Sequence, residues 1–198
     1  MFKKLFHFTI IILLMASYIK TQNKMVRKNF MYECLIQNQE YSYEYLYTNE
    51  HGKNVYVRPI GKIDNFHKIK WIIIETANHT DKYLMKNSHD DEFLCASSRF
   101  NDIFKARRVV EKFKLNLSTD KFENCFWKIQ HTTGNSNSSK QTYTIINAFY
   151  NQPLYAASFL FKTNLVNRKV YLWHDKKSLN SKKFKWFIDC KSGGYSIM

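Results

Sequence analysis

The sequence predicts an all-β protein built from three copies of one four-stranded unit. The first observation is a W-x-I pattern that recurs at Trp71, Trp127 and Trp186, with intervals of 56 and 59 residues. The second is that short runs rich in aromatic and β-branched residues, which favour strands, alternate with polar turns along the chain. The composition agrees, because 44% apolar and 17% aromatic residues with five Gly and two Pro supply a core and exclude a disordered chain.

The first segment of the chain stands apart from the fold. Residues 1–21 carry a basic start at Lys3 and Lys4 and then an apolar run, which is the pattern of a cleaved secretory signal peptide. An uncleaved membrane anchor is the alternative, but the run is shorter than the ~20 residues that a membrane-spanning helix needs. We therefore expect a secreted, extracellular protein with no transmembrane segment in the mature chain and one folded domain over residues 22–198.

Each copy is expected to hold four strands in a fixed order. The openings align as Ile36–Glu50, Tyr83–Ser98 and Tyr143–Ser158, which places Leu46, Leu94 and Leu154 at one position. A third β-rich run follows in each copy, at Val55–Arg58, Ala106–Val110 and Lys169–Trp173, and the W-x-I run is the fourth strand. The repeats then extend over about residues 32–75, 80–131 and 141–191. Because one such unit cannot cover its own apolar face, the copies must pack on one another.

Three units of this kind resemble a β-trefoil, in which three copies close a six-stranded barrel and cap it with three hairpins. The resemblance covers roughly residues 30–192 and rests on the threefold W-x-I pattern and the matching openings. It implies a fold and no specific family. The alternative is an ordinary β-sandwich in which three Trp are evenly spaced by accident.

Four cysteines in an oxidising compartment allow three disulfide pairings. They show neither CxxC spacing nor His partners at zinc-finger distances, so we expect no metal site. The trefoil resemblance selects one pairing, because the first and last strands of a closed threefold barrel lie side by side. It implies bonds from Cys34 to Cys190 and, within the second copy, from Cys95 to Cys125.

Three sequons fall where the repeats place loops. Asn78 lies between the first two copies, Asn116 lies in the long insertion of the second, and Asn137 lies before the third. Each is a candidate N-glycosylation site and therefore a predicted surface position.

The sequence offers no catalytic constellation, and we expect a protein that is not an enzyme and uses no cofactor or metal. The seven His are scattered, and a chain with five Gly has no Gly-rich phosphate loop. The adjacent pair His174–Asp175 and the run from His89 to Asp91 are acid–base candidates only by proximity, and we interpret them as solvated turn residues.

Positive charge is the informative polar feature, with a formal net charge of +15. A field of this sign attracts polyanions. Two clusters stand out: Lys105, Arg107, Arg108, Lys112 and Lys114 in the second copy, and Lys176, Lys177, Lys182, Lys183 and Lys185 in the last hairpin loop of the third. By analogy of fold, the second cluster resembles the place where trefoil growth factors hold heparin. The alternative is that the Lys content serves only solubility.

These clusters predict contact with an anionic glycan, a membrane surface or an extracellular host receptor. The residues predicted to make it are Lys176, Lys177, Lys182, Lys183 and Lys185, then Lys105, Arg107 and Arg108. Nucleic acid is a poor partner for an exported protein, and we expect a monomer. The trefoil resemblance implies a binding role of the kind that trefoil growth factors and many salivary or venom effectors have.

Two other function classes stay open. A ricin-type lectin is one, although its Q-x-W signature is absent, because Ile69, Cys125 and Phe184 stand two residues before the three Trp. A soybean-type Kunitz protease inhibitor is the other, although its cysteine spacing and N-terminal signature differ from those of this chain.

A row of tyrosines is a further surface candidate. Strand alternation puts Tyr41, Tyr43, Tyr45 and Tyr47 on one face, opposite Leu46, so an aromatic ladder is expected to point outward. Such a ladder is either a contact surface for a protein or sugar or only a stabilising feature of a hairpin, and we favour the structural interpretation.

Overall fold

The computed structural model describes residues 30–50, 52–76, 81–101, 106–116, 122–132, 140–160, 167–174, 180–191 and 195–196. The predicted signal peptide lies outside these residues, as do Lys105, Lys176, Lys177, Asn78 and Asn137. Over the ranges described, no helix is long and apolar enough to cross a membrane.

Each copy supplies four strands, as the repeat predicts. The first holds β1 (Phe30–Asn38), β2 (Glu44–Thr48), β3 (Val55–Pro59) and β4 (Lys70–Glu75). The second holds β5 (Tyr83–Asn87), β6 (Phe93–Phe100), β7 (Arg107–Phe113) and β8 (Trp127–His131). The third holds β9 (Tyr143–Asn147), β10 (Gln152–Leu160), β11 (Arg168–Trp173) and β12 (Lys185–Cys190). A short β13 (Tyr195–Ser196) pairs with β1.

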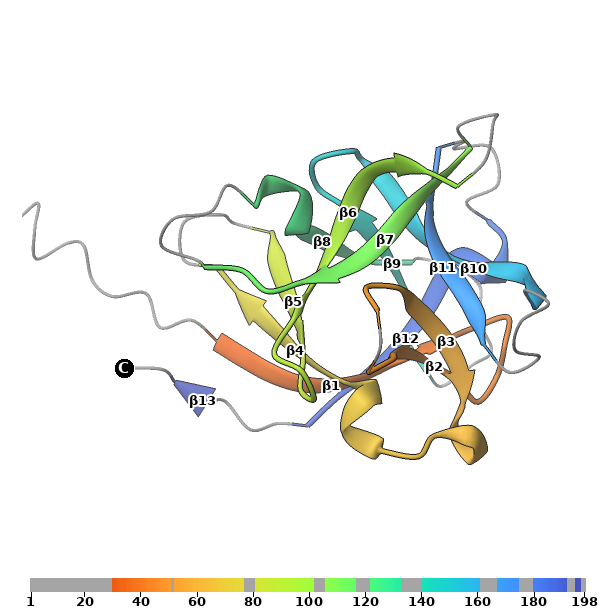
Figure 1. Ribbon diagram of the computed structural model, residues 1–198, viewed down its shortest axis with the longest axis horizontal. Helices are drawn as coiled ribbons and strands as arrows, with labels where there is room; N and C mark the ends of the chain where they lie inside the picture. The colour runs from red at the N-terminus through yellow and green to blue at the C-terminus, as the bar shows by residue number, and fades with distance from the viewer. Residues whose placement is uncertain are drawn as a thin grey trace, which may run out of the picture.

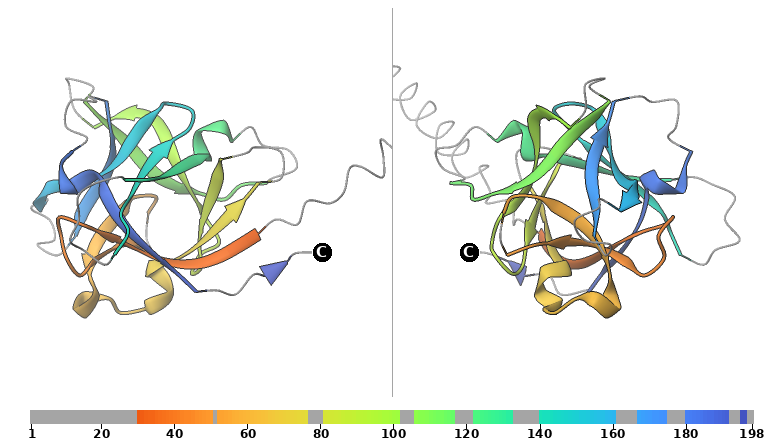
Figure 2. Two further views of the ribbon diagram at one scale, coloured as in Figure 1. Left: turned by 180° about the vertical axis from the view of Figure 1, so that it is seen from behind. Right: turned by 45° about the vertical axis from the view of Figure 1, so that its right-hand side comes forward.

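Six of these strands close into a barrel (Figure 1). Antiparallel pairs run from β1 to β4, β5, β8, β9 and β12 in turn, and β12 pairs with β1. The remaining strands form the hairpins β2–β3, β6–β7 and β10–β11, and β11 pairs with both β3 and β7 to join them. Figure 2 shows the closed body from two further sides. Closure leaves the barrel without an unpaired edge.

The three tryptophans share one environment at the centre of the barrel, where all are fully buried. Each indole Nε1 donates to the carbonyl oxygen of a buried leucine: Trp71 to Leu46 at 3.0 Å, Trp127 to Leu94 at 2.8 Å and Trp186 to Leu154 at 3.2 Å. A buried indole needs such a partner. The threefold equivalence that the W-x-I spacing predicts is therefore present in the core.

A buried asparagine repeats the same equivalence at the end of the first strand of each copy. Asn38, Asn87 and Asn147 are fully buried. Each side-chain amide donates to two carbonyl oxygens in the segment before a tryptophan, for example from Asn87 to Lys68 at 3.1 Å and to Lys70 at 3.2 Å. Each amide oxygen accepts from the backbone of the following turn. The asparagines thus tie every turn to the strand beside it.

Both predicted disulfides are confirmed. Cys34 on β1 and Cys190 on β12 are register partners and are bonded, and Cys95 is bonded to Cys125. A short 3₁₀ helix precedes each tryptophan strand and packs on the second strand of a copy: η2 (Phe66–Ile69) on β2, η3 (Glu123–Cys125) on β6 and η5 (Lys182–Phe184) on β10. A further one, η1 (Ile60–Lys62), follows β3.

The prediction that Tyr41, Tyr43, Tyr45 and Tyr47 lie on one outward face is wrong. β2 begins only at Glu44, and Tyr43 lies in the preceding turn with a φ of 71°. Tyr47 is buried, because η2 covers this part of β2 and Arg58 donates to the Tyr47 hydroxyl at 3.0 Å. The four rings therefore do not share one exposed face.

Candidate functional site

Around η5, the described lysines of the second basic cluster lie at or near the surface. Ser181 begins this helix and its hydroxyl accepts from the backbone N–H of Lys183. Lys182 is exposed, while Lys183 and Lys185 are half-buried. The Lys183 ammonium donates to the Ser158 hydroxyl at 2.7 Å, which holds it against β10. Among the described residues, no carboxylate forms an ion pair with any of these three lysines.

The first basic cluster does not form a common surface. Arg107 is half-buried on β7, with its guanidinium 5.8 Å from the centroid of the Tyr171 ring. Arg108 is buried and donates to the Gln152 amide oxygen at 3.0 Å and to the Ser97 carbonyl at 3.1 Å. Arg108 therefore cannot present its guanidinium to a polyanion, and we remove it from the predicted contact set.

Arg108 and Arg168 occupy equivalent places where one copy meets the next. The guanidinium of Arg108 lies 3.6 Å from the Tyr150 ring centroid, and that of Arg168 lies 3.9 Å from the Tyr41 ring centroid. Arg168 also donates to Glu44, which stands at the position of Gln152 in its own copy. The repeat alignment could have revealed that the two arginines are equivalent, because each stands two residues before an aligned buried valine. Sequence reasoning missed it by considering the arginines only as charge.

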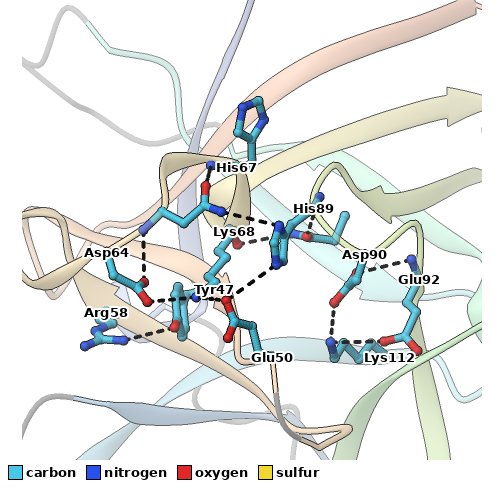
Figure 3. Close-up of polar contacts among 12 residues, drawn as sticks. Tyr47, Glu50, Arg58, Asp64, His67, Lys68, His89, Asp90, Glu92 and Lys112 are labelled. Carbon is cyan, nitrogen blue, oxygen red and sulfur yellow. Dashed lines mark hydrogen bonds and ion pairs between the residues drawn. The ribbon is translucent and has the colours of Figure 1, made fainter.

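Lys112 is likewise buried rather than available to a ligand (Figure 3). Its ammonium forms ion pairs with Asp90 and with Glu92, the latter at 3.0 Å. Burial alone would lower the pKa of Lys112, but the hydrogen bonds to the two carboxylates outweigh it, and the pKa lies above its ordinary value. Lys112 therefore stays charged and serves to join β7 to the turn before β6.

A second buried lysine, Lys68, forms a cluster with carboxylates of the first copy (Figure 3). Its ammonium lies 2.7 Å from Glu50 and 2.8 Å from Asp64, and Glu50 lies 3.8 Å from His89. Burial would lower the pKa of Lys68, but the hydrogen bonds to Asp64 and Glu50 raise it above its ordinary value. The hydrogen bond from Lys68 is also the main reason that the pKa of each carboxyl is lowered.

The charges of Lys68, Glu50 and Asp64 indicate a structural role for this cluster, which we call the clasp. All three groups are held in their charged forms at neutral pH, so the cluster offers neither a neutral lysine nucleophile nor a protonated carboxyl that could act as a general acid. It holds the segment of η1 and η2 onto the end of β2. Over the described ranges, no three His, Cys, Asp or Glu side chains lie close enough together to hold a metal ion.

The other sequence candidates lie in structural contacts or on the surface. The His174 ring nitrogen Nδ1 lies 2.7 Å from the Gln152 amide nitrogen, and Asp175 lies outside the described residues. Asn116 of the second sequon is exposed after β7. Its glycosylation stays a prediction.

A hollow that sequence reasoning missed opens on the outside of the barrel where the first and third copies meet. It has a volume of about 370 Å³. Its lining consists of side chains from β1, β2 and β12 with the start of the third copy: Leu35, Gln37, Tyr45, Lys140, Gln141, Tyr143, Phe187, Ile188 and Asp189. No motif marks these residues, because they come together only through the pairing of β12 with β1.

Comparison with known proteins finds relatives in structure alone. No family model and no curated protein matches the sequence. The designed threefold-symmetric protein ThreeFoil is similar with a TM-score of 0.57 and 11% identity, over 80% of this chain and 97% of that one. The structure named BEL beta-trefoil is similar with a TM-score of 0.54 and 10% identity, over 82% and 93%. The chain has a β-trefoil fold.

A natural toxin of this fold is also similar. The Haemophilus ducreyi cytolethal distending toxin matches with a TM-score of 0.56 and 13% identity, over 86% of this chain and 88% of that one. At these identities the likeness describes the fold.

Proposed function

We propose that this protein is a secreted, non-catalytic binding protein that contacts an anionic glycan through the lysines around η5 and the start of β12. The observation that carries the proposal is the excess of positive charge in the third copy, together with the lack of carboxylate partners for Lys182 and Lys185 among the described residues. Residues 141–198 contain nine Lys or Arg and only two acids, Asp175 and Asp189. Lysines without carboxylate partners keep their attraction for an external anion.

The contrast with the buried lysines supports this assignment. Lys68 and Lys112 are each neutralised by two carboxylates, and Arg168 is neutralised by Glu44. Lys182 is exposed and Lys185 is half-buried, and neither has such a partner among the described residues. An anionic chain that meets Lys182 and Lys185 therefore displaces no internal ion pair.

A binding role without catalysis is supported by how the reactive residue types are used. All four cysteines are in disulfides, and the buried lysines are held as charged ion pairs. These groups serve the fold and are not free to react with a partner.

Heparin affinity chromatography tests the proposal. We expect the mature protein to elute only above physiological ionic strength of about 0.15 M. The double variant Lys182→Glu/Lys185→Glu should lose at least about 2 kcal/mol of affinity, or about thirtyfold, because each cation near an anionic surface contributes about 1 kcal/mol.

The matched control is Lys62→Glu/Lys114→Glu, which changes two exposed lysines elsewhere and gives the same net charge. Equal loss of retention in both double variants would show attraction by net charge alone. Elution of the wild type below physiological ionic strength would overturn the proposal, and binding to anionic lipid vesicles without retention on heparin would assign the lysines to a membrane surface instead.

A further inference from the structure

Three of the side chains that line the hollow beside β12 form a row on adjacent strands. Tyr45 on β2 is the register partner of Gln37 on β1, and Gln37 is the register partner of Phe187 on β12. All three point away from the core, because Leu46, Ile36 and Trp186 beside them in sequence are fully buried. Two half-buried rings therefore flank one amide across two strand spacings, or about 9.5 Å.

The other two copies show that the fold does not require this row. The register that places Tyr45, Gln37 and Phe187 together also places Phe93, Lys86 and Ile72 together, and Pro153, Ile146 and Lys128. Tryptophan, asparagine and leucine repeat at all three core positions, whereas the outer row differs in each copy. The ring–amide–ring row is thus a local feature of the junction between the first and third copies.

The equivalent face between the first and second copies is covered by the chain itself. Phe93 is buried there in an apolar cluster with the Cys95–Cys125 disulfide. Phe113 at the end of β7, and Leu115 and Phe122 in the segments after β7, pack against this cluster. At the junction of the first and third copies the same face instead surrounds the hollow of about 370 Å³. That volume falls within the range of small-ligand sites.

The lining suits a ligand that has both an apolar face and hydroxyl groups. The rings of Tyr45, Phe187 and Tyr143 offer apolar surface. Gln37 and Gln141 each carry a donor and an acceptor, as a hydroxyl group does. The Gln141 amide oxygen accepts from the Tyr143 hydroxyl at 2.9 Å, which fixes the orientation of the amide.

The charges in the lining balance. Asp189 and Lys140 contribute one carboxylate and one ammonium, and the Lys140 ammonium lies 5.9 Å from the centroid of the Phe187 ring. In a protein with a formal net charge of +15, a locally neutral hollow does not favour an anion. A carboxylate that accepts hydrogen bonds from hydroxyl groups would also repel a sulfated ligand.

We infer that this hollow is a binding site for a neutral saccharide, with one pyranose ring packed on Tyr45 or Phe187 and its hydroxyls bonded to Gln37, Gln141 and Asp189. The hollow shares no lining residue with the lysines proposed to hold an anionic glycan, although Lys185 lies two residues before Phe187 on β12. Either assignment can fail without the other.

Titration of the ¹⁵N-labelled protein with a panel of neutral methyl pyranosides, followed by NMR, tests the inference. The panel consists of the methyl glycosides of glucose, galactose, mannose and N-acetylglucosamine. We expect shift changes at Gln37, Tyr45 and Phe187 for at least one of them. The variants Phe187→Ala and Asp189→Asn should each weaken its binding at least tenfold.

Asp189→Asn keeps the shape of an exposed side chain, so it tests the site even if Phe187→Ala fails to fold. It should leave heparin retention undiminished, because it removes a negative charge. The matched control is Phe149→Ala, which removes an exposed ring in the turn after β9 and outside the hollow. No shift changes with any neutral glycoside, equal weakening by Phe149→Ala, or binding of sulfated sugars alone would each overturn the inference.

Discussion

Removal of the Arg108 guanidinium distinguishes a structural residue from a surface contact. In the folded protein this group donates to the Gln152 amide and to the carbonyl oxygens of Ser97 and Ser98, and it stacks on the Tyr150 ring. A hydrogen bond from a charged group contributes about 1.5–3 kcal/mol, and a desolvated cation–π contact contributes about 2 kcal/mol. Because these contacts share one side chain and are not additive, we expect Arg108→Ala to lower the free energy of unfolding by about 3–5 kcal/mol.

Thermal and denaturant unfolding of the purified variant measure this effect. For a domain of this size the loss corresponds to a fall in Tm of about 10 °C. Arg107→Ala, one residue earlier and half-buried, should lower Tm by much less. Arg108→Lys should recover only part of the loss, because an ammonium cannot reproduce the planar fork of the guanidinium. A Tm within about 2 °C of wild type together with reduced heparin retention would refute the structural role and restore Arg108 to the contact surface.

Two further predictions concern backbone strain and acid stability. Tyr43 has a φ of 71° at the turn position where the other copies have Asp91 and Asn151, residues that tolerate this conformation. Tyr43→Asn should therefore raise the free energy of unfolding by about 1 kcal/mol. An equal gain in Tyr43→Ala would attribute the effect to loss of the exposed ring instead of to relief of backbone strain. The pKa values of Glu50 and Asp64, the carboxyl partners of Lys68, are lowered from 4.5 and 3.8, so the stability that these ion pairs add is present above those values and is lost as pH falls through the lower folded-state values. Between pH 6 and pH 3 the Tm of Lys68→Met should therefore fall less than the Tm of the wild type. Parallel plots of Tm against pH for the two proteins would contradict the structural role of this cluster.

The core and the disulfides could be predicted from the sequence because they depend on residues that repeat. Trp71, Trp127 and Trp186 recur with the spacing of one structural unit, and closure of three units places Cys34 beside Cys190. A residue type that recurs at the same position in three copies indicates that all three positions share one environment. An accidental spacing of the tryptophans does not explain such a repeat.

The candidate site depended on contacts that do not repeat and could not be predicted in the same way. Five cations within ten residues suggest an exposed basic patch, yet Arg108 and Lys112 are buried there, because their partners Gln152, Asp90 and Glu92 come from other strands and turns. A linear pattern of charge does not show which cations the fold itself neutralises. The hollow was hidden for a related reason, since Gln37 and Phe187 are 150 residues apart and meet only through barrel closure.

The residue directly after the core leucine shows how the fold tolerates differences between copies. In the second copy Cys95 bonds to Cys125 of η3, and in the third Tyr155 stacks on Phe184 of η5 with ring centroids 5.0 Å apart. A disulfide and an aromatic pair thus perform the same task of fastening a 3₁₀ helix onto a hairpin strand. Because a different pair makes this contact in the second and third copies, the barrel constrains its outer residues weakly. That freedom is what allows one copy to carry a basic surface, and one junction between copies to carry a row of rings and an amide, on a common core.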